Sequence, residues 1–375
     1  MTSSSVRVWG FFLGLVFLVS ASPAHAFPWN VRHGYPNCTA CHLSPGGGGV
    51  LSAYDRELAK EIQSMKSGEN EAAFLYGAVK TPEWLDAGGD LRYIQIFQDT
   101  PTSFSGRSFW MQSDLEAGVH LGKITLVGTA GWKGNANALR NDNDFISRRH
   151  YAMVTLDDRF TLRGGRFYPV FGLMQAEHED ATRGPIGFDQ GMESYNLEFS
   201  DQNENGSLFV SPIFGKLRGD RSADEKGLAA SKYFMFGPNT RVGVSGLYGK
   251  GFYNSYENRI LAGPSAIMNL SKSLFWMAEV DFERRKVIGA DRHETGLYEV
   301  QRLGYEPMQG LILSGRQDLQ RRVVGDPRTS AVTLGPQVDF YPRPHFDLQV
   351  ALARVFLPEN TPNFWMWTGV LHFYL

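Results

Sequence analysis

From about Gly88 to its last residue the chain alternates between apolar and polar positions. In residues 107–121, apolar and polar side chains interleave as Phe109, Met111, Leu115, Val119 and Leu121 against Gln112, Asp114, Glu116 and His120. The same alternation sets Leu274, Trp276, Ala278, Val280 and Phe282 against Glu279, Asp281 and Glu283, and Phe346, Leu348, Val350 and Leu352 against Asp347 and Gln349. A period of two predicts β-strands whose two faces meet different surroundings.

About sixteen segments show this pattern, an even number as in bacterial single-chain barrels. They lie near 88–98, 107–121, 123–132, 146–157, 159–168, 191–201, 205–215, 231–237, 240–249, 257–270, 273–285, 295–304, 308–318, 330–341, 345–356 and 365–375. Tight turns at 156–159 and 341–344 alternate with longer polar links at 133–145, 216–230 and 286–294. Charges at alternate positions require one face to meet water, so the pattern predicts lipid outside and a polar lumen inside. We therefore expect an all-β fold, a transmembrane antiparallel β-barrel over residues 87–375.

The last strand gives the most specific indication of a barrel. Apolar and aromatic residues occupy alternate positions there: Trp365, Trp367, Gly369, Leu371, Phe373 and Leu375. Such a strand resembles the signal read by the outer-membrane assembly machinery, although the usual last residue is aromatic and here it is Leu375. A soluble β-sandwich also has alternating strands, but it rarely combines so many strands with aromatic strand ends and charged faces.

The first 26 residues indicate export. Arg7 precedes an apolar run from Val8 to Val19, and Ala24-His25-Ala26 is a small-x-small cleavage site, so we predict a signal peptide over 1–26, cleaved between Ala26 and Phe27. An uncleaved anchor helix would need about 20 apolar residues. With 37 basic and 39 acidic residues, the charge balance argues against nucleic acid as a partner. Together with the strands, this predicts the outer membrane of a Gram-negative cell and contact with its lipid.

Residues 27–86 form a separate N-terminal module around Cys38-Thr39-Ala40-Cys41-His42. Two thiols at this spacing can bond a haem covalently while the following imidazole coordinates its iron. Cys38 and Cys41 are the only cysteines in the sequence. A disulfide between them is one alternative, and a metal site is another, although zinc would require a fourth ligand. We predict one covalent haem c held by Cys38, Cys41 and His42.

The rest of the module suits a haem site. Prolines and the glycines at 46–49 keep the chain irregular, as close approach to a flat ring requires. A short helix is expected from Leu51 to Met65, with one apolar stripe at Leu51, Tyr54, Leu58, Ile62 and Met65. The stripe could cover the haem, line a plug, or pack against the barrel wall. We expect the module to lie inside the lumen.

The second iron ligand decides between electron transfer and open-site chemistry. The first candidate is His178, because Pro169 and Gly172 end a strand early and could send the chain into the lumen. His33 is the alternative, followed by Met65 and Met174, whereas the other histidines have no visible partner. Arginines at 148, 149, 163, 166 and 183 could bind haem propionates or pair with lumen carboxylates, the commoner role in barrels.

A signal peptide, one Cys-x-x-Cys-His near the mature N-terminus, the Ser44-Pro45-Gly46 sequence after it and a barrel of about sixteen strands resemble the fused monohaem cytochrome–porins of the outer membrane. Their best-known members are iron oxidases. The resemblance implies haem attachment at Cys38, Cys41 and His42, and a distal ligand at His178. It also implies electron exchange between an extracellular donor or acceptor and periplasmic electron-carrier cytochromes. The rival functions are a porin with a haem-containing plug or redox gate, and a peroxidase-like enzyme with an open iron site.

Overall fold

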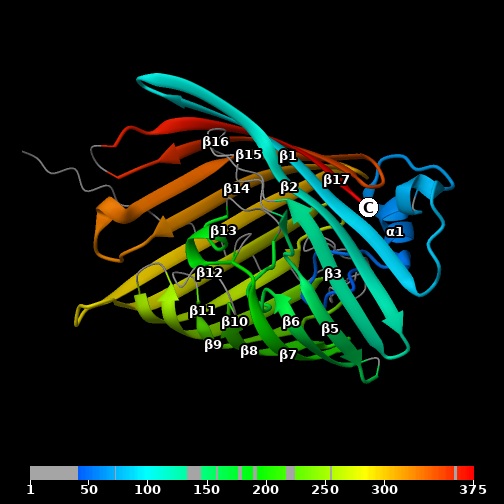
Figure 1. The fold of residues 1–375 in the computed structure, drawn as a ribbon. Helices are drawn as coiled ribbons and strands as arrows, with labels where there is room; N and C mark the ends of the chain where they lie inside the picture. Colours follow the sequence, from blue (N-terminus) through cyan, green and yellow to red (C-terminus); the bar gives the residue numbers. More distant parts are fainter. Residues whose placement is uncertain are drawn as a thin grey trace, which may run out of the picture.

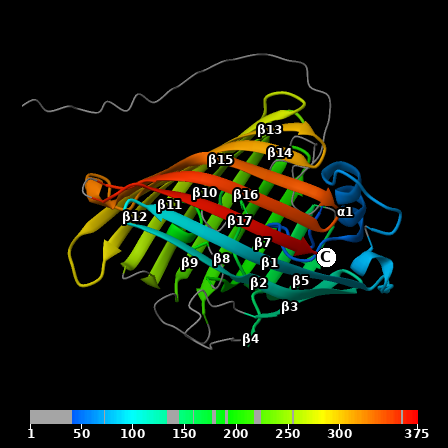
Figure 2. The same ribbon diagram turned by 90° about the horizontal axis from the view of Figure 1, so that it is seen from above.

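The computed structural model describes residues 41–375 except 72, 133–144, 158, 176–179, 189–191, 217–223, 254–255 and 359–360. Its strands form one antiparallel sheet that curls into a barrel (Figures 1 and 2). The strands are β1 (Leu85–Thr100), β2 (Ser103–Leu121), β3 (Ile124–Trp132), β4 (Phe145–Ile146), β5 (His150–Thr155), β6 (Phe160–Phe167), β7 (Ser194–Asn203), β8 (Gly206–Gly215), β9 (Lys226–Met235), β10 (Thr240–Tyr253), β11 (Tyr256–Asn269), β12 (Leu274–Val287), β13 (His293–Met308), β14 (Leu311–Arg321), β15 (Ser330–Arg343), β16 (Phe346–Phe356) and β17 (Phe364–Tyr374).

The barrel is closed because β1 pairs with β17 on one side and with β2 on the other. β4 and β5 both pair with β3, so they are two pieces of one wall strand. The 17 labelled strands therefore occupy sixteen positions, which confirms the strand count predicted from the sequence. None of the helices in the described ranges has the length and apolarity to cross a bilayer.

The two faces of the wall differ as the alternation predicts. On β12, Phe282 is 53% exposed on the outer face, whereas its neighbours Asp281 and Glu283 are 0% and 2% exposed on the inner face. Large apolar side chains stay exposed around the outer surface, among them Leu91, Leu115, Leu126, Leu228, Ile260, Leu303, Leu313, Leu334, Leu348 and Leu371. In a closed barrel this surface is the one that contacts lipid.

One predicted face is wrong at β2. The pairing of β1 with β2 shifts so that Arg92 faces Gln112 and Tyr93 faces Trp110, which leaves Met111 as the extra residue of a β-bulge. Along the chain the bulge moves the outward face from even to odd positions, so Trp110 before it is 54% exposed and Leu115 beyond it is 61% exposed. Phe109 and Met111 therefore do not continue the face of Leu115.

The C-terminal strand closes the barrel as its pattern suggested. Trp365, Trp367 and Leu371 point outward on β17, where they are 41%, 49% and 40% exposed. Leu375 follows the strand and is buried, with its N–H donating to the carbonyl of Gly89 at 2.9 Å. The last residue thus fastens the closing strand to the first one.

The predicted helix is shorter and has a different face. Residues Ala53–Leu58 form α1 and residues Ala59–Gln63 form η3, a single π-helical turn that shifts the phase of the side chains. Tyr54 of the expected apolar stripe is 58% exposed, whereas Arg56 is buried and donates to the carbonyl of Ala87. The helix lies at one end of the barrel rather than inside it (Figure 2).

That end carries the tight turns of the wall. Gln309, in the turn from β13 to β14, donates to the carbonyls of Glu61 and Ser64, both at 2.8 Å, and Arg343 pairs with Glu71 at 3.0 Å. The 3-10 turns η4 (Phe74–Gly77), η5 (Gly184–Ile186) and η6 (Pro327–Thr329) complete the described elements. Two of the links expected at the other end are shorter than predicted, because β9 begins at Lys226 and β12 runs on to Val287.

The outward face of β16 makes a direct test of the lipid-facing surface. Val350→Lys is expected to destabilise the folded barrel by about 2–4 kcal/mol, because Val350 is 47% exposed near the middle of β16 and the change places a cation deep in the lipid-facing surface. Gln349→Lys, one position along on the inner face, should change stability by much less, since the lumen accepts charge. Urea titrations of both variants in lipid vesicles measure the difference. Equal effects would contradict the assignment of the two faces.

Candidate functional site in the barrel lumen

Two segments of the chain enter the barrel and contact its inner wall. The first, called here the N-terminal lumen segment, comprises residues 41–52 and precedes α1. The second, called the inward loop, comprises the described residues between β6 and β7 in the range 168–193. The early end of β6 before Pro169 and the entry of the chain into the lumen were both expected from the sequence, and the structure confirms them.

The inward loop is fixed to the far wall by polar bonds. The N–H groups of Gly172 and Leu173 donate to Ser245 at 3.0 Å and to the Glu279 carboxylate at 2.8 Å. The Tyr233 hydroxyl donates to the carbonyl of Gly172 at 2.6 Å. Gly172 has a φ of 64°, and a Cβ placed there would lie 1.7 Å from Oε1 of Glu279, so the position requires glycine.

Apolar packing also holds this loop, which corrects the expectation of a uniformly polar lumen. The Phe171 and Phe188 rings stack with centroids 4.9 Å apart. Around them and around Leu173, the inner faces of the wall present buried apolar side chains: Ile213, Ala229, Leu247, Leu261, Ile267, Phe275, Met277, Tyr298, Val300, Ile312 and Tyr341. Part of the lumen is therefore filled like the core of a soluble domain.

The N-terminal lumen segment is a small hairpin. Leu43 donates to the carbonyl of Val50 at 3.1 Å and Ser52 donates to that of Cys41 at 2.9 Å. The glycines at 47, 48 and 49 all have positive φ and form its turn. Leu43 packs against a cluster of inward residues of β3, β5 and β6, which are Val127, Tyr151, Met153 and Phe167. The segment therefore contacts the wall opposite the one that holds the inward loop.

The described half of the predicted haem motif lies in this hairpin. Cys41 is 6% exposed, and Nδ1 of His42 is buried without a hydrogen-bond partner among the described residues. Burial, followed by the nearby Arg149 guanidinium, lowers the pKa of His42 to about 4, so its imidazole is neutral at neutral pH. The other predicted ligands, Cys38, His33 and His178, lie outside the described residues.

The two segments meet at Gly46. A Cβ on Gly46 would lie 2.7 Å from Cγ2 of Val170 and 3.7 Å from Cε of Met174, both in the inward loop. Met174 has a φ of 58°, and its sulfur accepts hydrogen bonds from Phe171 N–H at 3.4 Å and from Arg183 at 3.9 Å. Of the two reserve ligands, Met174 is thus beside the motif-bearing segment, whereas Met65 lies at the rim against Tyr341.

The arginines near these segments have carboxylate partners. Each of four pairs with an inward Asp or Glu: Arg148 with Asp114 at 2.9 Å, Arg149 with Glu116 at 3.6 Å, Arg163 with Glu198 at 2.7 Å and Arg166 with Glu193 at 3.3 Å. These four arginines therefore pair with lumen carboxylates, which is the commoner of the two roles considered for them; the other was binding haem propionates. Arg163 also donates to the Ser44 hydroxyl at 2.9 Å, so the arginine of one ion pair connects the wall to the N-terminal lumen segment by a hydrogen bond.

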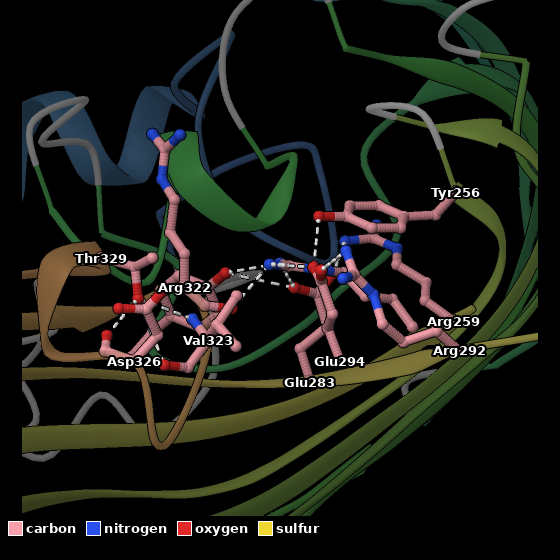
Figure 3. Close-up of polar contacts among 11 residues, drawn as sticks. Tyr256, Arg259, Glu283, Arg292, Glu294, Arg322, Val323, Asp326 and Thr329 are labelled. Atoms are coloured by element: carbon pink, nitrogen blue, oxygen red, sulfur yellow. Dashed lines mark hydrogen bonds and ion pairs between the residues drawn. The ribbon is translucent and has the colours of Figure 1, made fainter. Parts of the chain in front are cut away.

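A second charged network crosses the inner wall where β11, β12 and β13 approach the longer links (Figure 3). Arg259 contacts Glu283 at 3.2 Å, and Arg285 contacts the same carboxylate at 2.6 Å and Glu294 at 3.5 Å. Tyr256 donates to Glu294 at 3.1 Å. The alternate charges of β12 indicated one side of this network, but the facing arginine of β11 could be found only from the strand pairing.

Three strand histidines have partners that the sequence did not reveal. His120 contacts Asp86 at 2.8 Å and His150 contacts the Tyr195 hydroxyl at 2.9 Å. His372, on the closing strand, lies 3.1 Å from Asp90 of β1 and 3.7 Å from Asp347 of β16. The prediction that these histidines lack partners is therefore wrong, because each partner comes from another strand.

Comparison with solved structures identifies the class of fold. OmpT of Vibrio cholerae superposes with a TM-score of 0.59 at 11% identity, covering 80% of this chain and 100% of that one. The anion-selective porin from Comamonas acidovorans gives 0.59 at 9% identity, over 78% and 99% of the two chains, and Pseudomonas putida OprB gives 0.59 at 8% identity, over 78% and 94%. No protein-family model and no curated protein matches the sequence.

The chain therefore has the closed sixteen-position barrel of outer-membrane porins. The outer-membrane localisation predicted from the sequence is confirmed, since the barrel fold and the apolar outer surface both agree with it. The resemblance to cytochrome–porins is supported for its porin part alone. The haem-binding part remains a prediction.

Substitutions in the Arg163–Glu198 pair test whether the buried charges of the lumen depend on their ion-pair partners for stability. Both side chains are at most 2% exposed, so Arg163→Met should cost about 3–5 kcal/mol by leaving a buried carboxylate without its cation. The double variant Arg163→Met with Glu198→Leu should recover most of that loss. Chemical denaturation in detergent micelles measures both. A double variant no more stable than the single one would contradict the pairing.

Proposed function

We propose that this protein is an outer-membrane channel of the porin type whose lumen holds a plug, formed by the N-terminal lumen segment and the inward loop. The observation that carries the proposal is the contact of the two segments at Gly46, with each fastened to a different wall. A polar barrel interior allows solutes to pass, and segments within it restrict that passage. Displacement of the plug would then open the channel.

The attachments of the two segments suggest which one moves. The inward loop is held by backbone hydrogen bonds to buried wall side chains and by two apolar clusters. The N-terminal lumen segment packs Leu43 in a wall cluster and places the Ser44 hydroxyl on a wall arginine, and Cys41, Val50 and Leu51 are buried as well. Its described backbone hydrogen bonds close its own hairpin. Because the described backbone hydrogen bonds of the inward loop reach the wall and those of the N-terminal lumen segment stay within it, the N-terminal lumen segment is the movable part of the plug.

Gly49 offers a way to displace that segment. Its φ is 75°, and a Cβ there would lie 2.2 Å from Nη1 of Arg149 and 2.9 Å from Oε2 of Glu116. Gly49→Leu should weaken docking by about 2–5 kcal/mol, through backbone strain and overlap with a buried ion pair. Planar-bilayer recordings of the full chain should then show a larger conductance than wild type.

Gly122→Leu is the matched control for that experiment. Gly122 has a φ of 64° in the turn between β2 and β3, and a Cβ placed there would meet nothing within 4 Å, so the same substitution adds strain without overlap. Its conductance should equal that of wild type. If Gly49→Leu also conducts like wild type while folding normally, the N-terminal lumen segment is not a plug.

A second candidate function, electron transfer through a covalent haem c, is favoured by the burial of Cys41 and of Nδ1 of His42 in the lumen. The donor set fits: a thiol, and a neutral imidazole with a buried nitrogen that has no described hydrogen-bond partner. Cys38, Cys41 and His42 would hold the group, with His178, His33 or Met174 as further ligand candidates. A bound haem would supply one-electron chemistry at a site surrounded by a low-dielectric wall.

Electron transfer through this haem requires redox partners on both sides of the membrane. The module at the tight-turn end would exchange electrons with periplasmic electron-carrier cytochromes, and an extracellular donor or acceptor would act at the other end. A haem group carried by the plug also links the two candidates, because its redox state could then control the channel.

Covalent haem is tested on the purified protein after denaturation. In-gel peroxidase staining should mark the wild-type band, and Cys41→Ser should lose most of the stain because one thioether remains at best. Gly122→Leu again serves as the control that keeps the motif. An unstained wild-type band from cells competent in cytochrome maturation would remove the electron-transfer candidate and leave the channel proposal intact.

A further inference from the structure

Three polar side chains, Glu299 and Gln301 on β13 and Gln317 on β14, point away from the lumen. Glu299 lies between Tyr298 and Val300, which are both 1% exposed and pack inside the barrel. Gln317 lies between Arg316 and Asp318, which bind the inward loop at Asp180 and at the N–H of Ala181. Since successive strand residues face opposite sides, these polar residues lie on the outer surface.

The outward polar residues form one hydrogen-bonded group. Gln301 and Gln317 are direct partners across β13 and β14, and both amides donate to Oε1 of Glu299, Gln317 at 3.5 Å. The Trp276 indole donates to Gln301 at 3.4 Å. We call these four residues, Trp276, Glu299, Gln301 and Gln317, the outer polar patch.

The outer polar patch is surrounded by the lipid-facing surface. Its outward neighbours include Phe282, Leu303, Tyr305, Leu313 and Leu334, which are 42–53% exposed. Gln317 lies four residues, or about 13 Å along the strand, from Arg321 at the end of β14. The apolar band of such barrels is about 25 Å tall, so the patch lies within it rather than at its border.

A carboxylate in this position is costly against lipid. Acyl chains offer it no hydrogen-bond donor, and anionic head groups repel it. A polar residue on a lipid-facing wall therefore indicates contact with protein. The patch itself carries the complementary groups, because each glutamine amide has two N–H donors and a carboxylate accepts several bonds.

From this self-complementarity we propose that the outer polar patch is the interface with a second copy of the chain, across a two-fold axis. In such an interface each residue of one copy meets the paired residue of the other, so the glutamines of one patch donate to Glu299 of its partner. The apolar side chains around the patch pack in the same contact. The inference is independent of the proposed function, since it concerns the outer wall alone.

The first test is the mass of the protein extracted in mild detergent, measured by light scattering. Wild type is expected as a dimer. Glu299→Leu and Gln317→Leu should each raise the dissociation constant at least about tenfold, since polar contacts within lipid carry such an interface. Both variants replace a polar residue on a lipid-facing wall, so the monomer should fold at least as stably as wild type. A weaker dimer together with an equally stable monomer distinguishes a role in the interface from a role in folding.

The second test places the contact on this wall. Leu303→Cys, beside the patch, should give a disulfide-linked dimer on oxidation of native outer membranes, whereas Leu371→Cys on β17 should not. Wild type controls for Cys38 and Cys41. A monomer by light scattering, a dimer that persists in Glu299→Leu, or equal crosslinking from positions 303 and 371 would each overturn the proposal. A crosslink to a different protein, without a dimer, would overturn it too.

Discussion

A strand within lipid has no water to bind its backbone N–H and C=O groups, so every such group in the wall must find a partner in a neighbouring strand. The ten residue pairs between β1 and β17, from Asp90 with Tyr374 to Asp99 with Trp365, meet that requirement by leaving the sheet without an edge. The rest of the structure depends on this closure. It creates an interior, and with it the division of each strand into a lipid-facing and a lumen-facing row.

Closure also explains why the lumen contains so many paired charges. Inward carboxylates and arginines from different strands and links come within short distance of one another, and most of these side chains are buried. A buried charge without a partner is costly, so the pairs from Arg148–Asp114 to Arg166–Glu193 are a condition of filling the lumen. The inward loop adds apolar packing, which makes part of the interior a solid core rather than a water-filled passage.

The two proposals concern opposite sides of the same wall. Inside, the described backbone hydrogen bonds of the N-terminal lumen segment stay within its hairpin, whereas those of the inward loop reach the wall, and this contrast is the basis of the proposed movable plug. Outside, the outer polar patch departs from the apolar pattern of its neighbours. Val300 and Gln301 are adjacent in sequence, yet one packs against the lumen core and the other belongs to the outer patch. A change of one residue in register would exchange the two surfaces.

The sequence by itself determined the wall: alternation with a period of two located the strands, their number, the closing strand and the early end of β6. It did so because the alternation of apolar and polar residues within a single strand reflects its lipid-facing and lumen-facing sides. It could not determine the bulge at Met111, which depends on pairing with Arg92 and Tyr93, or the position of Arg56, which depends on the barrel rim. The partners of His372 and the meeting of Gly46 with Val170 likewise join residues far apart in the chain. Such contacts are products of closure, and only the tertiary structure decides them.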